Sequence, residues 1–150
     1  MRDYIKLLED KGELLQVDRE VDPKFELAAV TKRVQEQGDQ LVRFNKVKGT
    51  NFPVVTNLYT SRRRLCDLIN APIDGFCHSW AGLLAACEKS TLAPTRLLDS
   101  ASERVTGKLG ELPLITYHEK DAGPYFTSAI FLAKDPDSGV ANLSFDRAMY

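Results

Sequence analysis

The chain has 150 residues, of which 43% are hydrophobic and 27% are charged, as is usual for a globular protein with a buried core. Its formal net charge of -1 argues against binding to nucleic acid or to a membrane surface through bulk electrostatics. No apolar run is long enough to span a membrane, and no apolar leader follows Met1. We therefore expect a cytoplasmic protein with reduced cysteines.

The first hundred residues alternate between helical and extended patterns. A helix is predicted from Asp3 to Glu9, and a strand from Glu13 to Val17. Asp22 followed by Pro23 predicts the start of a second helix, because aspartate caps free amides and proline is tolerated at the first helical position. Gly38 is expected to end this helix.

Two more strands and two more helices are predicted in the same region. The strands cover Leu41 to Phe44 and Pro53 to Asn57, with a polar loop between them. Ser61 is expected to cap a helix that ends at Ile69, and Ser79 is expected to cap another that ends at Lys89. We therefore expect an α/β domain over residues 1–105.

The pattern changes after residue 105, and residues 106–150 are predicted to begin a second domain. Three extended segments follow with no helical pattern between them. They are Leu112–Thr116, Tyr125–Ala133 and Ala141–Met149. The loop 135–139, Asp-Pro-Asp-Ser-Gly, has the composition of a hairpin connection. The second region is therefore interpreted as an all-β unit.

Several reactive side chains have a structural interpretation. Cys66 and Cys87 lie in apolar helical patterns and are expected to be buried thiols, with Leu83 and Leu84 also facing inward. The basic run 62–64 is typical of a solvated helix face. The two histidines lack metal-ligand spacing to each other or to a cysteine, and no glycine-rich nucleotide motif is present.

The last predicted strand carries two candidate functional residues. Asn142 offers an oxygen to a hard cation or amide donors to a phosphate, although an asparagine beside a turn also commonly satisfies backbone groups. Arg147 lies in an apolar segment, where a buried guanidinium needs a partner; a surface arginine on an edge strand is the alternative. The two are five residues apart, so a regular strand points them to opposite faces. A shared site requires a bulge between them.

Hydroxyl groups add to this polar set. Thr127 and Ser144 lie on strands that are predicted to be neighbours, and their hydroxyls suit the oxygens of a phosphate. The backbone of Phe145 and Asp146 offers further hydrogen bonds. Ordinary polar side chains on a half-exposed sheet remain the alternative interpretation.

Three motifs in this region, in order and at matching spacing, resemble the UbiD family of prenylated-flavin-dependent decarboxylases. They are Asp121–Thr127, Asp135–Gly139 and Asn142–Met149. Near the start of the chain, Arg2–Pro23 and Val42–Asn57 also resemble the family. The resemblance spans nearly the whole chain but covers only the front of a full-length member.

The resemblance implies an N-terminal α/β domain followed by the start of a β split barrel, similar to flavin reductases, that binds the flavin. The implied reaction is non-oxidative, reversible decarboxylation of an aromatic or α,β-unsaturated carboxylic acid. The implied cofactors are prenylated FMN, a divalent metal, usually Mn²⁺, and a monovalent cation such as K⁺. A homo-oligomer, dimeric or hexameric, or association with partner (de)carboxylase subunits is expected.

The resemblance also assigns roles to residues. Asn142 corresponds to a metal ligand, and Arg147 to a residue that positions and helps to protonate the substrate together with a glutamate beyond residue 150. The expected contacts to the cofactor are Thr127, Asn142, Ser144, Phe145, Asp146 and Arg147. Asp146 departs from the family, which often has histidine, tyrosine or an apolar residue there.

Because only one of three expected metal ligands is present, the chain is interpreted as an incomplete site that is inactive alone. Two alternatives remain open. One is a non-catalytic N-terminal module that assembles a multi-chain carboxylase. The other is a reductase-type flavin-binding split barrel.

Overall fold

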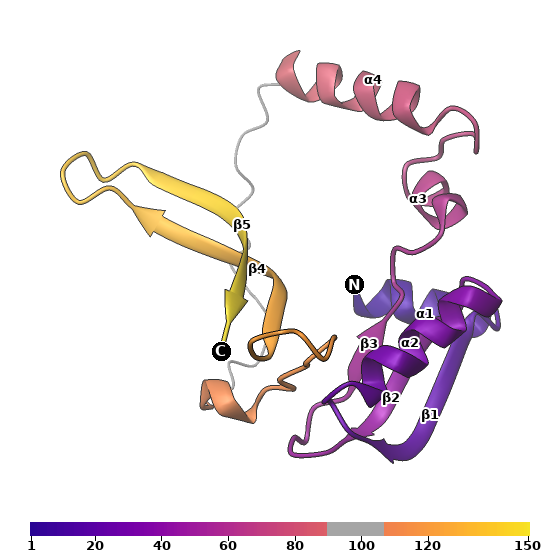
Figure 1. The fold of residues 1–150 in the computed structure, drawn as a ribbon. Coiled ribbons are helices and arrows are strands. Elements are labelled where there is room, and N and C mark those ends of the chain that lie inside the picture. The colour runs from indigo at the N-terminus through magenta and orange to yellow at the C-terminus, as the bar shows by residue number, and fades with distance from the viewer. Residues whose placement is uncertain (90–106) are drawn as a thin grey trace. The chain divides into compact units, whose positions relative to one another are not determined.

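A computed structural model of the chain describes residues 1–89 and 107–150 (Figure 1). The chain forms two compact units. The first combines Met1–Asn57 with Lys108–Tyr150, and the second is Leu58–Gly107. The structure thus groups the C-terminal segment with the N-terminal sheet, while the division of the chain at residue 105 stays a prediction.

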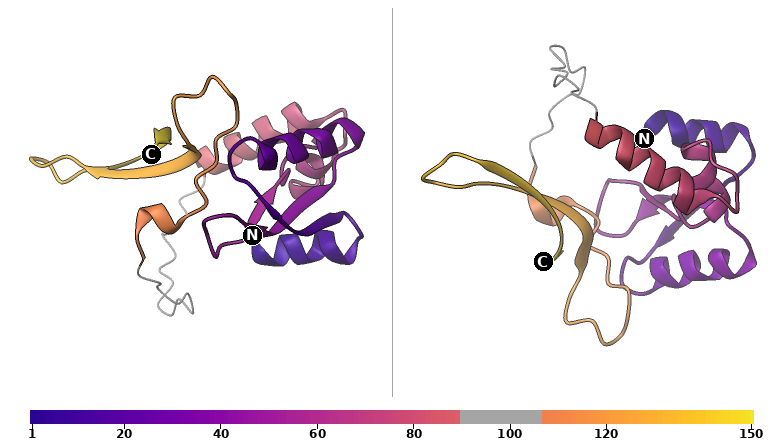
Figure 2. Two further views of the ribbon diagram at one scale, coloured as in Figure 1. Left: turned by 60° about the horizontal axis from the view of Figure 1, so that its bottom comes forward. Right: turned by 90° about the horizontal axis from the view of Figure 1, so that it is seen from above.

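The first unit is built on a three-stranded mixed sheet. β1 (Leu14–Val21) runs parallel to β2 (Leu41–Val47), and β2 runs antiparallel to β3 (Val54–Thr56), in the order β1-β2-β3. The helices α1 (Arg2–Asp10) and α2 (Glu26–Gln37) lie on opposite sides of this sheet (Figure 2). The predicted α/β arrangement of the N-terminal region is therefore confirmed. β2 continues past Phe44, which shortens the predicted loop.

One face of this sheet, together with α2, forms the hydrophobic core. The buried cluster consists of Val21, Leu27, Val34, Val42, Phe44, Val47, Val54 and Ile115. In β2, Val42 and Phe44 point into this cluster, so Leu41 and Arg43 point to the opposite face, the side of α1. Leu41 is fully buried and Leu8 of α1 is nearly so. Both faces of the sheet therefore bury apolar side chains, but different ones.

The start of α2 differs from the prediction. Asp22 does not cap the helix, because its Oδ1 accepts the amide of Lys24 at 2.8 Å, and the N-cap is Phe25 with φ of 71°. The amide of Phe25 donates to the carbonyl of Thr116 at 3.0 Å, and the amide of Thr116 donates to the carbonyl of Pro23 at 3.2 Å. A β-bridge to a distant segment thus occupies the residues predicted for the first helical turn, and it holds Phe25 in the unfavourable left-handed region.

The segment Leu112–Thr116 is not a strand of a second sheet. It meets the N-terminal region through the single bridge at Thr116, and it places Ile115, which is 8% exposed, in the core. Just before it, the short 3-10 helix η1 (Leu109–Glu111) is held by the hydroxyl of Thr50, which donates to the carbonyl of Glu111 at 2.7 Å. The first of the three β segments predicted for this region therefore contributes to the core of the N-terminal sheet.

The described part of the second unit contains α3 (Arg62–Leu68) and α4 (Phe76–Lys89). Ser61 occupies the N-cap of α3, as predicted, but makes no capping bond through its side chain. Ser79 does not cap α4, because its amide donates to the carbonyl of Gly75 at 2.9 Å as part of a helix that has already begun. Both predicted helices exist, and the second begins earlier than predicted.

Burial in the second unit corrects two further predictions. Arg64 is only 1% exposed, so the basic run is not entirely a solvated face. Three consecutive residues point in directions about 100° apart on a helix and cannot all face water when the helix packs. Cys66 is buried as predicted, but Cys87, Leu83 and Leu84 are exposed, since no described residue of α4 is buried.

The C-terminal strands form a hairpin. β4 (Tyr125–Lys134) pairs antiparallel with β5 (Ala141–Met149), and the loop 135–139 connects them as predicted. The described residues show this two-stranded sheet and no barrel, so the split barrel stays a prediction. Within the described ranges, no helix is long and apolar enough to cross a membrane.

We expect Ile115→Ala to lower the free energy of unfolding by about 2–4 kcal/mol, because it opens a cavity where the C-terminal segment enters the core. Leu109→Ala is the control: Leu109 is 57% exposed, and its truncation should cost at most about 0.5 kcal/mol. Urea denaturation followed by circular dichroism measures both. Equal midpoints for the two variants would contradict the assignment of Ile115 to the core.

Candidate functional site

The two faces of β5 separate the predicted site residues. On a two-residue period, Asn142, Ser144 and Asp146 share one face, whereas Phe145 and Arg147 point to the other. A hydrogen bond supports this assignment, because the hydroxyl of Ser144 donates to Oδ2 of Asp146 at 2.6 Å. The structure therefore gathers three oxygen-bearing side chains on one face and does not place Arg147 among them.

A bulge is present, but in the opposite strand. The register pairs Phe126 with Ala148 and Ala129 with Asp146, so two residues of β4 face the single residue Arg147. These two residues are Thr127 and Ser128. The bulge therefore lies in β4, opposite Arg147. β5 itself stays regular from Asn142 to Asp146.

The bulge adds one residue that sequence reasoning missed. Ser128 stands with Thr127 opposite Arg147 in the backbone register, so two hydroxyl-bearing residues face one arginine at this point of the ladder. Bulges frequently re-aim side chains next to functional sites. The available signal was two adjacent small polar residues in a strand that is otherwise apolar.

The hairpin does not enclose a site by itself. Ser144 is half-buried, while the other predicted site residues are exposed, including Phe145 at 79%. Large apolar side chains are exposed on both strands. They include Ile130, Phe131, Leu132 and Leu143. An isolated two-stranded ribbon cannot bury such faces.

The hairpin loop is ordered by one carboxylate. Oδ1 of Asp135 accepts hydrogen bonds from the amide of Ser138 at 2.7 Å, from its hydroxyl at 2.8 Å and from the amide of Asp137 at 3.1 Å. These bonds, first those from Ser138, hold the pKa of Asp135 below its usual value. Gly139 has φ of +70°, which favours glycine, and its amide donates to the carbonyl of Asp135 at 2.9 Å. The loop fixes the register that places Asn142.

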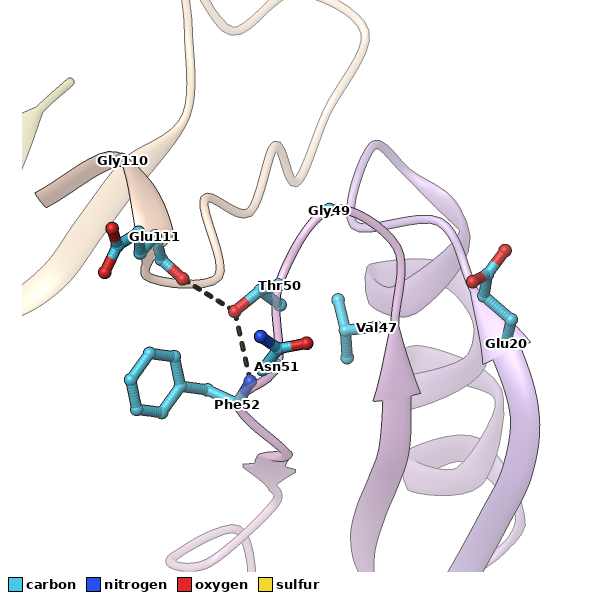
Figure 3. A pocket seen from close by; sticks show the side chains of 8 residues that line it. All are labelled: Glu20, Val47, Gly49, Thr50, Asn51, Phe52, Gly110 and Glu111. Atoms are coloured by element: carbon cyan, nitrogen blue, oxygen red, sulfur yellow. Dashed lines mark hydrogen bonds between the residues drawn. The ribbon is translucent and has the colours of Figure 1, made fainter. Parts of the chain in front are cut away.

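A cavity of about 540 Å³ lies at the turn between β2 and β3, away from these residues (Figure 3). Its walls are formed by Glu20, Val47, Gly49, Thr50, Asn51, Phe52, Gly110 and Glu111. The hydroxyl of Thr50 lies between the amide of Phe52, which donates to it at 3.1 Å, and the carbonyl of Glu111. Because that hydroxyl already has two partners, we assign Thr50 a structural role.

The described side chains offer few groupings that suit a metal ion. Residues 1–89 and 107–150 contain no group of three His, Cys, Asp or Glu side chains placed to hold a metal ion. Asn142 and Asp146 share a face of β5, but four residues of a regular strand separate them by roughly 13 Å, too far for one metal ion to bind both. Asn142, which offers an amide oxygen of the kind that hard cations bind, thus stays the single candidate metal donor of the hairpin.

Comparison with known protein families identifies the chain. Residues 5–83 match the N-terminal domain of 3-octaprenyl-4-hydroxybenzoate carboxy-lyase, and residues 95–150 match the Rift-related domain of the same enzyme. The chain belongs to the UbiD family. The motifs that suggested this family therefore identified it correctly. Both Asn142 and Arg147 fall in the second match.

Solved UbiD-class structures share the fold. An evolved dimeric form of HmfF from Pelotomaculum thermopropionicum, in complex with prFMN (prenylated FMN), is 37% identical and has a TM-score of 0.74. It covers 97% of this chain and 34% of its own. The closed form of vanillic acid decarboxylase (ShVdcCD) from Sedimentibacter hydroxybenzoicus is 26% identical, with a TM-score of 0.80, over 99% of this chain and 34% of its own.

Curated relatives also match nearly the whole of this chain with about a third of their own length. An uncharacterized protein from Rhodospirillum rubrum is 36% identical over 95% of this chain and 31% of its own length. Anhydromevalonate phosphate decarboxylase from Methanothermobacter thermautotrophicus is 29% identical over 99% of this chain and 33% of its own length. The chain thus spans about a third of the relatives that it matches.

The order of the hairpin loop should depend on pH. Because the pKa of Asp135 is lower in the folded loop than its usual value of 3.8, its stabilising contribution is present above that value and is lost as pH falls through the lower folded pKa. An NMR acid titration of the Ser138 amide should give a midpoint below 3.8. Asp135→Asn should abolish this titration, and a midpoint at or above 3.8 in the unmodified chain would refute the assignment.

Proposed function

We propose that this chain is the N-terminal part of a carboxy-lyase that uses prenylated FMN to decarboxylate, reversibly and without net oxidation, an aromatic or α,β-unsaturated carboxylic acid. The observation that supports it most is the polar face of β5, Asn142, Ser144 and Asp146, inside the segment that matches the Rift-related domain. HmfF, a relative by fold and sequence, is known in complex with prFMN. Because the chain spans about a third of such proteins, the activity belongs to the whole protein.

The donors of this face suit a phosphate held by a cation. Asn142 offers an amide oxygen to a divalent metal such as Mn²⁺, while Asp146, four residues along the strand, adds negative charge to the same face. The hydroxyl of Ser144 and the backbone of Phe145 and Asp146 suit phosphate or flavin oxygens. A monovalent cation such as K⁺ is proposed at the same phosphate. When bound, prenylated FMN supplies an electron sink for the departure of CO₂.

Arg147 is proposed to serve the substrate. A guanidinium binds a carboxylate with two parallel hydrogen bonds, which fixes the plane of the carboxylate. Thr127 and Ser128 face Arg147 in the backbone register, and their hydroxyls are proposed to serve the cofactor or the guanidinium. By resemblance, an acidic partner of Arg147 lies beyond residue 150. Asn142 and Arg147 point to opposite faces of β5, which fits a role for the first toward the cofactor and for the second toward the substrate.

The whole protein is proposed to be cytoplasmic and to act as a homo-oligomer or with partner (de)carboxylase subunits. A second candidate function is a non-catalytic assembly module. The observation in its favour is exposed apolar surface: Trp80, Leu83 and Leu84 on α4, and Phe131 and Phe145 on the hairpin, are all at least 44% exposed. Turnover by the whole protein decides between the two candidates.

In the whole protein, Asn142→Ala should lose the cofactor, while Arg147→Ala should keep it and lower kcat by at least about 100-fold. The first residue is proposed to hold the metal and phosphate, and the second to act on the substrate. Flavin absorbance, bound Mn²⁺ and CO₂ release measure the two effects separately. Asn142→Asp, which keeps an oxygen donor, is the matched control and should retain metal. Wild-type turnover by both alanine variants would refute the roles.

The 150-residue chain alone should be inactive and should bind prenylated FMN weakly. It carries a partial set of metal donors, and loss of coordinating groups removes most of the affinity of a hard-cation site. The purified chain is reconstituted with cofactor and Mn²⁺ without oxygen, and CO₂ release is followed. Turnover comparable to that of a full-length enzyme would mean that these residues already form a complete site.

A further inference from the structure

A second cavity, of about 420 Å³, lies between α1 and the outer part of the sheet. Its walls are Arg2, Ile5, Lys6 and Glu9 of α1 together with Arg43, Pro53 and Val55. The four helix residues are spaced by three and four, so they form one face of α1. Arg43 and Val55 are direct partners in the β2–β3 ladder and therefore project from the same face of the sheet.

The cavity has an excess of positive charge. Three of its lining residues are cations and one, Glu9, is an acid. The carboxylate of Glu9 already accepts a hydrogen bond from Nε2 of Gln16 at 2.8 Å. Nδ2 of Asn45 donates to Oε1 of Gln16 at 3.2 Å and to Oδ1 of Asp18 at 2.7 Å. These neutral amides leave the negative charge of Glu9 in place, so the lining carries three cations against one acid.

Arg43 is the strongest sign of a missing ligand. Its side chain is half-buried, yet it forms no hydrogen bond or ion pair with any residue that the structure describes. Its neighbours across the strands are Gln16 and Val55, and neither is an acid. A guanidinium that loses part of its hydration without gaining a partner is destabilising, so an anion that enters the cavity would relieve this cost.

We infer that this cavity binds a small organic carboxylate with an apolar body. Arg43 and Lys6 would hold the carboxylate, since a guanidinium matches its two oxygens. Ile5, Pro53 and Val55 supply apolar walls, which an inorganic anion would not use. The volume falls in the range of roughly 300–1,000 Å³ that small-molecule sites occupy. The inference uses no hairpin residue and does not depend on the proposed function.

The test is ligand-observed fluorine NMR of the 150-residue chain with 4-fluorobenzoate, read out as line broadening. Binding should be saturable, and the neutral analogue 4-fluorobenzamide should bind at least about tenfold more weakly, the loss expected for one charge-assisted hydrogen bond. Arg43→Met and Lys6→Met, which keep an unbranched side chain, should each weaken binding by about tenfold. Lys6 is exposed on a helix, so its variant tests the site even if Arg43→Met impairs folding.

A control locates the site. Lys46→Met removes a cation from the same strand but outside the cavity, and it should bind 4-fluorobenzoate as the unmodified chain does. Loss of binding in Arg147→Ala alone would place the ligand at the hairpin and overturn the inference. The same conclusion would follow from non-saturable binding, from equal binding of 4-fluorobenzamide, or from inorganic phosphate competing as strongly as unlabelled benzoate.

Discussion

Backbone pairing between Lys24 and Thr116 is the constraint on which the first unit depends. It joins the end of β1 to a segment far away in sequence, and it places Ile115 in the core. The carbonyl of Ile115 then accepts the amide of Tyr125, the first residue of β4, at 3.1 Å. The amide of Tyr150 donates to the carbonyl of Pro124 at 3.0 Å at the other end of the hairpin. A series of hydrogen bonds thus leads from the sheet to the strands that carry the candidate site.

This constraint explains where sequence reasoning succeeded and where it failed. Elements defined by their own periodicity, such as α1, β2 and β5, were found within a few residues. The start of α2 was wrong because Asp22 and Pro23 are a sound local helix signal that a non-local bridge overrides. Segment 112–116 has the composition of a strand, but whether such a segment joins a sheet or fills a core depends on partners that its own sequence does not specify.

In the candidate site, too, local periodicity was predictable from the sequence and non-local pairing was not. The opposite orientations of Asn142 and Arg147 follow from the two-residue period and were predictable. The bulge at Thr127 and Ser128 was not, because register depends on the geometry of the loop that begins at Asp135 and on how two strands twist together. The burial of Arg64 could not be predicted from the local sequence either, because a run of three arginines does not indicate which side chain faces the protein interior. The family motifs indicated a candidate site, while the pairing of strands determines which of its residues share a face.

Asp146 gains a specific meaning from this geometry. It shares a face with Asn142 and accepts the hydroxyl of Ser144, so it brings negative charge to the surface where the proposed function places a phosphate. Two anions on one exposed face repel each other unless a cation lies between them. Asn142 and Asp146 are four residues apart on a regular strand, roughly 13 Å, so a single metal ion cannot contact both side chains. A metal at Asn142 would still offset the charge of Asp146, so phosphate affinity should depend on prior metal binding. The acid that departs from the family pattern then acts through its charge and not as a metal ligand.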